Sequence, residues 1–440
     1  MDVMEKTDPF LLGHEQFSKR VNDVPSWLEK RRSVALAHFK VLGPPTRGVE
    51  QWRFTNVRRI AALGAVAAGP GEKTLTDLSD YSADGATIRM IFENGFFRAD
   101  LSELDNLPKG LRLRSLAEVL GEHAQAPLTQ LDPHVDSGDE AFTALNGAFM
   151  EDGVFLEVAA NTVLETPIQL LFVGHAADSP RAAHPRNLIA IGENAEVTLV
   201  EAYVGQGAYW TNAVTQIDLA PSARLTHYYK QRESERACHV TSHIIRANRD
   251  SRLVMHNLLT GSELMRHNIE VSFTGEGAEA QVNGLYVADG DQHLDNYIHM
   301  DHQVPHCSSD QFFKGILDGK GQAIFTGKVT VRPDAQKTDA KQANRNLLLS
   351  ESARIDTQPQ LEIYADDVKC AHGATTGQID PDALFYLQSR GIDPKSAREL
   401  LLFAFAKEVI ERLPHEAMRQ EAESFLNQRF SSASLSGDLP

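Results

Sequence analysis

A repeated pattern of short apolar strands and polar turns runs through the middle of the chain. Each unit has an alternating apolar segment, a polar turn and a small residue that opens the next segment. Four copies are NLIAIGENAEVTLV, TQIDLAPSARLTHY, HIIRANRDSRLVMH and IEVSFTGEGAEAQV. Their small residues are Ala195, Ala223, Ser251 and Ala278, at spacings of 28, 28 and 27 residues. We place two further copies, with wider spacing, at Gly321 and Ala353.

This near-constant period predicts a stacked solenoid over residues 146–378. A strand–turn–strand unit cannot bury its apolar face alone, whereas stacked units pair their backbone groups and share one continuous core. A β-sandwich with fortuitous spacing is the alternative. The two ends of a solenoid would expose strand edges, so flanking segments or another solenoid should cover them.

Helical patterns flank the repeats. Residues 1–145 mix helical segments with a few short strands and are expected to form a mainly helical N-terminal domain. Within them, Pro25–Leu42 has apolar residues at helical spacing, and Gly43-Pro44-Pro45 should end that helix.

Residues 379–430 are expected to form a C-terminal helical domain, followed by a disordered tail at 431–440. Asp380-Pro381 and Asp393-Pro394 each combine an N-cap residue with a proline in the first turn, and Gly391 should close the first helix. The second helix contains seven consecutive apolar residues, 400–406, which coat it on all sides. This predicts burial on two sides, within a bundle or against a partner. The candidate partner contacts are Leu401, Leu402, Phe403 and Phe405.

Charge and cysteine content restrict the class of protein. The formal net charge is −17, which argues against nucleic acid or anionic membrane as a partner. Three cysteines in 440 residues give no disulfide framework, as expected in a reducing cytoplasm. The N-terminus has no apolar signal-peptide core, and no apolar run is long enough to span a membrane. We therefore expect a cytoplasmic protein.

The stretch LEIYADDVKCAHGATTG, residues 361–377, contains the most suggestive chemistry. On a strand, Val368, Cys370 and His372 would share one face. A thiol beside an imidazole can ligate iron, copper or zinc, although a buried thiol with a structural histidine gives the same pattern.

Two other motifs give weaker evidence for a ligand site. The group formed by His293, His299, His302, His306 and Cys307 has metal-ligand composition, but its spacing favours a structural polar network. Gly315–Lys320 lacks the spacing and the hydroxyl residue of a phosphate loop, so no ATP hydrolysis is expected from this chain alone.

Several long runs resemble one known family, in order. They are PHCSSDQFFKGIL, FTGKVTVRPDAQKTDAKQANRNLLL, LEIYADDVKCAHGATTG and LFYLQSRGI, with EQWRFTNVRRI as a weaker match nearer the N-terminus. The chain resembles the SufB/SufD group of iron–sulfur cluster assembly proteins over roughly residues 150–412. The resemblance implies a right-handed parallel β-helix.

The cysteine pattern points to the SufD side of this family. SufB-like chains have a cysteine motif near the N-terminus, a further cysteine before the histidine region and a glutamate directly after that histidine. Here no cysteine precedes Cys238, none lies between Cys307 and Cys370, and Gly373 follows His372.

The resemblance implies a non-catalytic scaffold subunit. It would pair with a SufB-like homologue, dock a SufC-like ABC ATPase through residues 380–430, and share a transient iron–sulfur cluster near Cys370 and His372. A flavin is compatible with such complexes, but no residue here identifies its site. The sequence leaves open whether the isolated chain forms a homodimer. The alternatives are a polysaccharide-active β-helix enzyme, which the 7% aromatic content does not favour, and a structural adaptor without a ligand.

Overall fold

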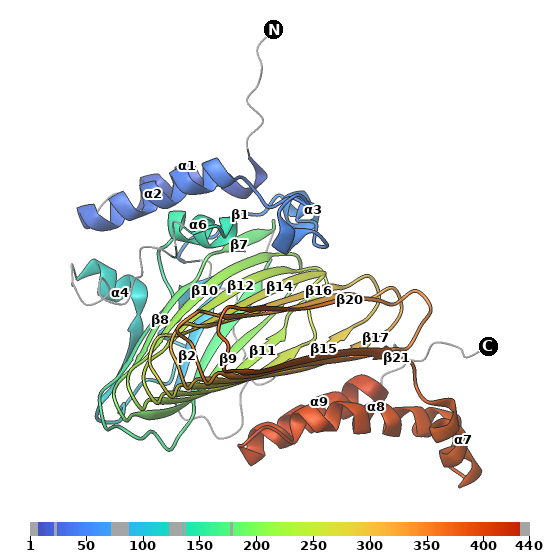
Figure 1. The fold of residues 1–440 in the computed structure, drawn as a ribbon. Helices are drawn as coiled ribbons and strands as arrows, with labels where there is room; N and C mark the ends of the chain where they lie inside the picture. The colour runs from blue at the N-terminus through green and yellow to red at the C-terminus, as the bar shows by residue number, and fades with distance from the viewer. Residues whose placement is uncertain are drawn as a thin grey trace.

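Two β-sheets form a parallel solenoid with helices on both outer faces (Figure 1). The computed structural model describes residues 8–21, 24–71, 88–122, 135, 138–176 and 179–431. The tail expected at 431–440 therefore lies, apart from its first residue, outside the described residues. The predicted solenoid is confirmed.

Successive strands of the repeat alternate between the two sheets. The first sheet has 11 strands: β1 (Val66–Ala67), β4 (Leu111–Ser115), β5 (Val154–Val158), β7 (Arg181–Ala183), β8 (Arg186–Ile191), β10 (Trp210–Leu219), β12 (Cys238–Ala247), β14 (Leu264–Phe273), β16 (His293–His302), β18 (Gln322–Val331) and β20 (Arg354–Ile363). The second has 10 strands: β2 (Ile88–Glu93), β3 (Phe96–Phe97), β6 (Ile168–His175), β9 (Glu196–Gln206), β11 (Arg224–Arg232), β13 (Arg252–Leu259), β15 (Glu279–Ala288), β17 (Ser308–Leu317), β19 (Asp339–Leu348) and β21 (Lys369–Gly377).

The small residues of the repeat form a column at one corner of the solenoid. Ala195, Ala223, Ser251 and Ala278 are fully buried, and each carbonyl accepts a hydrogen bond from the next coil at 2.8 to 3.0 Å. The residue before each of them has a positive φ, from 55° at Asn194 to 75° at Gly277. A tight left-handed turn brings the coils close together at this corner, so a larger side chain would not fit.

Two of the expected repeat positions belong to a different corner. After Ala278 the column continues with Cys307, whose carbonyl accepts from Asp339 N at 3.1 Å. Gly321 and Ala353 instead lie where the chain passes from the second sheet back to the first, and Arg354 N donates to Gly321 O at 3.0 Å. Both corners need small residues, so the sequence pattern alone does not separate them.

The N-terminal helices lie on the outer face of the first sheet (Figure 1). They are η1 (Pro9–Leu11), α1 (His14–Arg20), α2 (Ser26–Leu42), η2 (Glu50–Trp52), α3 (Arg58–Leu63), α4 (Leu116–Gly121) and α6 (Ala141–Ala148). Phe10, Trp52 and Phe142 pack with Trp210 of β10 in one buried aromatic cluster. The predicted helix at 25–42 is confirmed as α2, which ends at Gly43.

The residues before the repeats also contribute strands. β2 pairs with β6 in parallel, and β4 pairs with β5 in the antiparallel sense, so residues from the N-terminal region extend both sheets. No helix in the described part of the chain is both long enough and apolar enough to serve as a membrane span.

The described part of the chain ends in three helices, of which α8 (Pro394–Ile410) and α9 (Glu416–Ser431) pack against the outer face of the second sheet and α7 (Pro381–Ser389) lies against α8 (Figure 1). The predicted caps are confirmed, because Asp380 accepts from Asp382 N at 2.9 Å and Asp393 accepts from Ser396 N at 3.1 Å. Gly391 follows α7 with φ of 87°.

Candidate functional site

The open end of the solenoid carries the predicted thiol and imidazole. β20 and β21 are the last strands of their sheets, and within the described residues each pairs with a strand on one side only. Cys370 lies opposite Ala340 and His372 opposite Gln342 in the register of β21 with β19. Both therefore occupy inward-facing positions of the last coil, on the same face as predicted.

Cys370 and His372 differ in their surroundings. Cys370 is half-buried and packs, like Val368, against the interior core, and burial raises the pKa of its thiol. His372 is exposed at the mouth of the solenoid. The His372 imidazole is therefore the more accessible of the two donors at this edge. The raised pKa of Cys370 further disfavours the thiol, since a protonated thiol is a poor ligand.

The interior below His372 is polar. The column of residues under it consists of Gln342 and Gln311, and Gln342 Nε2 donates to Gln311 Oε1 at 3.1 Å. In the neighbouring column, Asn344 Nδ2 donates to Tyr286 Oη at 3.0 Å. Beside His372 the mouth is therefore lined by neutral hydrogen-bonding groups, whereas Leu361, Val368 and Cys370 pack against the apolar core.

The four apolar residues proposed as partner contacts lie in the middle of α8. Leu402 is only 1% exposed and packs with Leu285, Phe312 and Ile316 of the second sheet. Leu401, Phe403 and Phe405 are half-buried. Leu402 is thus a core residue of this chain. Part of the burial predicted for its helix is therefore provided by the chain's own second sheet.

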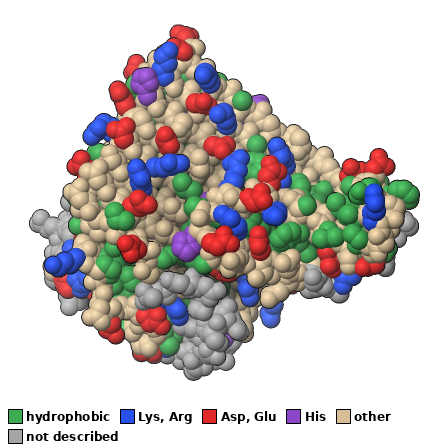
Figure 2. Space-filling model, turned by 90° about the horizontal axis from the view of Figure 1, so that it is seen from below, with side chains coloured by type: hydrophobic (Ala, Val, Ile, Leu, Met, Phe, Trp, Pro, Cys, Tyr) green, Lys and Arg blue, Asp and Glu red, His purple; other side chains and the backbone are tan. Residues whose placement is uncertain are grey.

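Other apolar side chains of this region face outward. Phe385, Tyr386 and Leu400 are 71%, 56% and 50% exposed. Figure 2 shows hydrophobic side chains gathered along the arm formed by the C-terminal helices. α7 has no buried residue, so this helix depends least on the solenoid for its position.

Three of the other four candidate histidines form separate structural hydrogen bonds. His293 Nε2 lies 2.9 Å from Thr55 Oγ1, His299 Nε2 3.0 Å from Thr330 Oγ1, and His302 Nε2 2.9 Å from Ser309 Oγ. Within the described residues, the three do not converge on a common point that could hold a metal. The interpretation as a structural polar network fits this arrangement.

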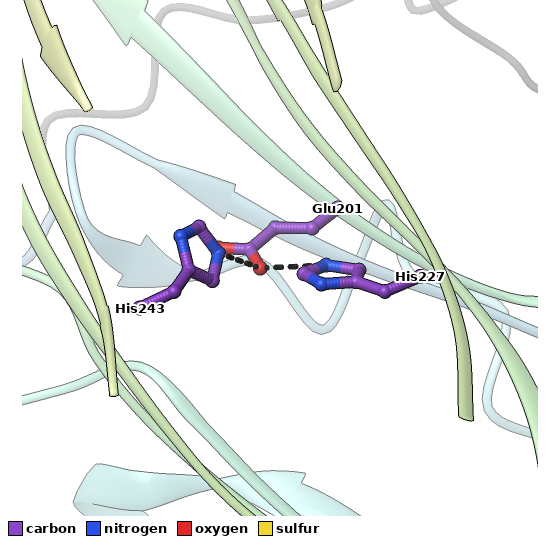
Figure 3. Close-up of side chains that lie close together, drawn as sticks. All are labelled: Glu201, His227 and His243. Carbon is purple, nitrogen blue, oxygen red and sulfur yellow. Dashed lines mark hydrogen bonds and ion pairs between the residues drawn. The ribbon is translucent and has the colours of Figure 1, made fainter. Parts of the chain in front are cut away.

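A buried cluster inside the solenoid was missed by the sequence reasoning. Glu201 of β9 and His227 of β11 come from the second sheet, and His243 of β12 faces them from the first (Figure 3). Glu201 Oε2 lies 3.1 Å from His227 Nε2 and 3.1 Å from His243 Nε2. All three side chains have no exposed surface.

The electrostatics of this cluster favour an ionised carboxylate. Burial alone would raise the pKa of Glu201, but His243 and His227 outweigh it and hold that pKa well below its usual value. Burial lowers the pKa of His227, and Glu201 opposes this only in part. The sequence signal was present: a glutamate and histidines stand at inward strand positions, and the residues in register with His227 on the neighbouring coils, Leu199 and Met255, are apolar.

Comparison with known proteins defines the class to which this solenoid belongs. Residues 172–405 match the family described as "SUF system FeS cluster assembly, SufBD core domain", and residues 14–170 match "SufBD protein N-terminal region". The fold with its open end is therefore that of an iron–sulfur cluster assembly protein.

The chain belongs to the SufBD family. It is 35% identical over 400 residues to an iron–sulfur cluster assembly SufBD family protein of Synechocystis, covering 88% of each chain. It is 30% identical to the iron–sulfur cluster assembly protein SufD of Escherichia coli, over 91% of this chain and 93% of that one. It is also 32% identical to the chloroplastic protein ABCI7 of Arabidopsis thaliana, over 95% and 90%. The resemblance to the SufD side of the family is confirmed.

Proposed function

We propose that this chain is a SufD-like scaffold subunit of a cytoplasmic iron–sulfur cluster assembly complex, without catalytic activity of its own. It would pair with a SufB-like homologue and dock a SufC-like ABC ATPase. The cluster would be a transient cargo shared with the SufB-like partner. ATP-driven movement of the ATPase would shift the junction between the two solenoids and open its ligands to iron and sulfur.

The open C-terminal end of the solenoid is the observation that carries this proposal. Among the described residues no strand pairs with the outer edge of β20 or β21, and Ile363 and Tyr364 beside this edge are 41% and 61% exposed. An uncovered edge with exposed apolar residues favours pairing with another chain, because a partner strand would hydrogen-bond the free backbone groups and bury the apolar surface. A homologous solenoid offers a matching edge, and Cys370 and His372 would then lie at the junction.

The exposed face of α7 and the start of α8 supports the second contact. Large apolar side chains are exposed there: Phe385 and Tyr386 on α7, which has no buried residue, and Leu400 on α8. Large exposed aromatic side chains are typical of interface anchors. We assign this surface, rather than the buried Leu402, to the ATPase.

Co-expression with SufB-like and SufC-like proteins tests the proposal. Native mass spectrometry should detect a complex containing all three, and anaerobic reconstitution should add iron and sulfide to it. Phe385→Asp should release the ATPase while the pairing with the SufB-like chain persists. Val41→Asp is the matched control, because Val41 is 82% exposed on α2, in the N-terminal helices. A chain that stays alone in the presence of both partners contradicts the proposal.

A further inference from the structure

The carboxylate and two imidazoles inside the solenoid have the composition of a transition-metal site. Two histidine nitrogens and one glutamate oxygen converge from three different strands, and the ligand atoms all lie within 4.8 Å of one another (Figure 3). Two donors bound to one metal at about 2.1 Å are separated by roughly 3 to 3.5 Å. The distances of 3.1 Å from Glu201 Oε2 to each histidine nitrogen are already in this range.

The surroundings of the cluster resemble the outer ligand shell of a metal centre. Glu201 Oε1 accepts hydrogen bonds from Tyr203 Oη at 2.9 Å and from Thr215 Oγ1 at 3.0 Å. His243 Nδ1 lies 3.0 Å from His267 Nε2. Such second contacts fix the orientation of ligands and leave their inner atoms free to bind. Glu201 thus has one oxygen anchored and the other directed at the imidazoles.

Hydrogen bonding within the chain does not fully satisfy the cluster. Among the described residues, neither ring nitrogen of His227 has a well-directed hydrogen bond, although Nε2 is close to Glu201. His227 has no exposed surface, so water in bulk does not solvate it either. A buried imidazole whose contact with its carboxylate partner is poorly directed is costly, and a ligand bound by both His227 and Glu201 would remove that cost.

We propose that Glu201, His227 and His243 bind a divalent first-row transition metal inside the solenoid, with iron(II) as the ion taken up in the cell. Imidazole nitrogens select against magnesium and calcium, which prefer oxygen ligands only. Two histidines with one carboxylate are a common ligand set for iron(II). This site is distinct from Cys370 and His372 and does not depend on the proposed pairing with other subunits.

The enclosed position of the site determines how it must be loaded. None of the three ligands is exposed, so a metal enters as the chain folds or through transient opening of the coils. The full-length chain should therefore be produced in cobalt-supplemented and, separately, in iron-supplemented medium, and purified without oxygen. Cobalt(II) serves as the spectroscopic probe, and the iron(II) preparation tests the physiological ion.

Metal content and coordination are the measurements. The wild-type chain should retain about one cobalt ion after desalting, with X-ray absorption showing nitrogen and oxygen ligands that include imidazole. Glu201→Gln keeps the shape of the side chain but removes its charge, and should lower the retained cobalt at least about tenfold. His239→Gln is the matched control, because His239 is another fully buried histidine of β12 outside the ligand set. It should retain cobalt like the wild type, as should His372→Ala.

Three results would overturn the proposal. The first is a wild-type chain that retains neither cobalt nor iron. The second is equal retention by wild type and a folded Glu201→Gln chain. The third is a coordination shell without imidazole, which needs no variant and so remains decisive even if Glu201→Gln fails to fold. Any of these would make the cluster a structural hydrogen-bond network.

Discussion

Leu402 provides the sharpest test of how the C-terminal helices are held. Leu402 is 1% exposed and Leu400, two residues earlier on the same helix, is 50% exposed. Leu402→Ala would leave a cavity between α8 and the second sheet, beside Leu285 and Phe312. Substitutions of this kind cost about 3 kcal/mol, whereas Leu400→Ala at an exposed position should change stability by less than about 0.5 kcal/mol.

Hydrogen exchange is the suitable assay, because the helices can open without unfolding the solenoid. A loss of about 3 kcal/mol accelerates exchange that depends on opening by roughly 100-fold, since each 1.4 kcal/mol is a factor of ten. We expect this acceleration in α8 and α9 for Leu402→Ala, with the solenoid strands unchanged. Leu400→Ala should accelerate exchange less than about threefold.

The two variants separate an intramolecular contact from a partner contact. If Leu402→Ala leaves the exchange of α8 unchanged, the packing of these helices against the solenoid does not exist in solution. If Leu400→Ala has an equally large effect, exposure does not explain the difference between the two positions. Either result would refute the reasoning from burial.

Three further predictions concern the junction, the pH dependence and the packing of the interior. In the assembled complex, His372→Ala should leave assembly intact but sharply reduce the iron and sulfide bound per complex. Cys370→Ser should have a milder effect, because burial raises the pKa of that thiol, and Cys238→Ser and Cys307→Ser should have the smallest. Normal iron and sulfide loading by His372→Ala would eliminate its role as a ligand. Burial lowers the pKa of His302 and of His256 to about 4, against about 6.5 in the unfolded chain. Between these values the unfolded chain binds protons that the native chain does not, so the free energy of unfolding should fall as the pH drops from about 6.5 to about 4, by roughly 2 kcal/mol per histidine at pH 5. Denaturation at pH 7 and pH 5 measures this, and a His302→Gln chain with an undiminished fall would contradict the assignment. Finally, a Cβ at Gly284 would overlap the ring of Phe313, whereas one at Gly373 meets no atom within 4 Å. Gly284→Ala should therefore lower the free energy of unfolding by about 1–3 kcal/mol, and Gly373→Ala should not. Equal stability of the two variants would contradict this prediction and show that the interior adapts to the added methyl group.

The repeating part of the fold and the local capping signals can be predicted from the sequence alone. The small residues from Ala195 to Ala278 recur because each coil must turn in the same confined space. Such a constraint leaves a regular spacing that can be recognised in the sequence. The caps at Asp380 and Asp393 are likewise local, because an N-cap side chain binds backbone groups two or three residues away. Cys370 and His372 share a face for the same reason, through the alternation of one strand.

Which residues meet across the solenoid cannot be predicted from the sequence and depends on the three-dimensional fold. Glu201, His227 and His243 lie on three strands in two sheets, and their approach depends on coil length, on register and on the separation of the sheets. None of these is encoded near any one of the three residues. The position of Leu402 was undecided for the same reason: its apolar neighbours surround the helix, and packing against the second sheet selects which of them are buried.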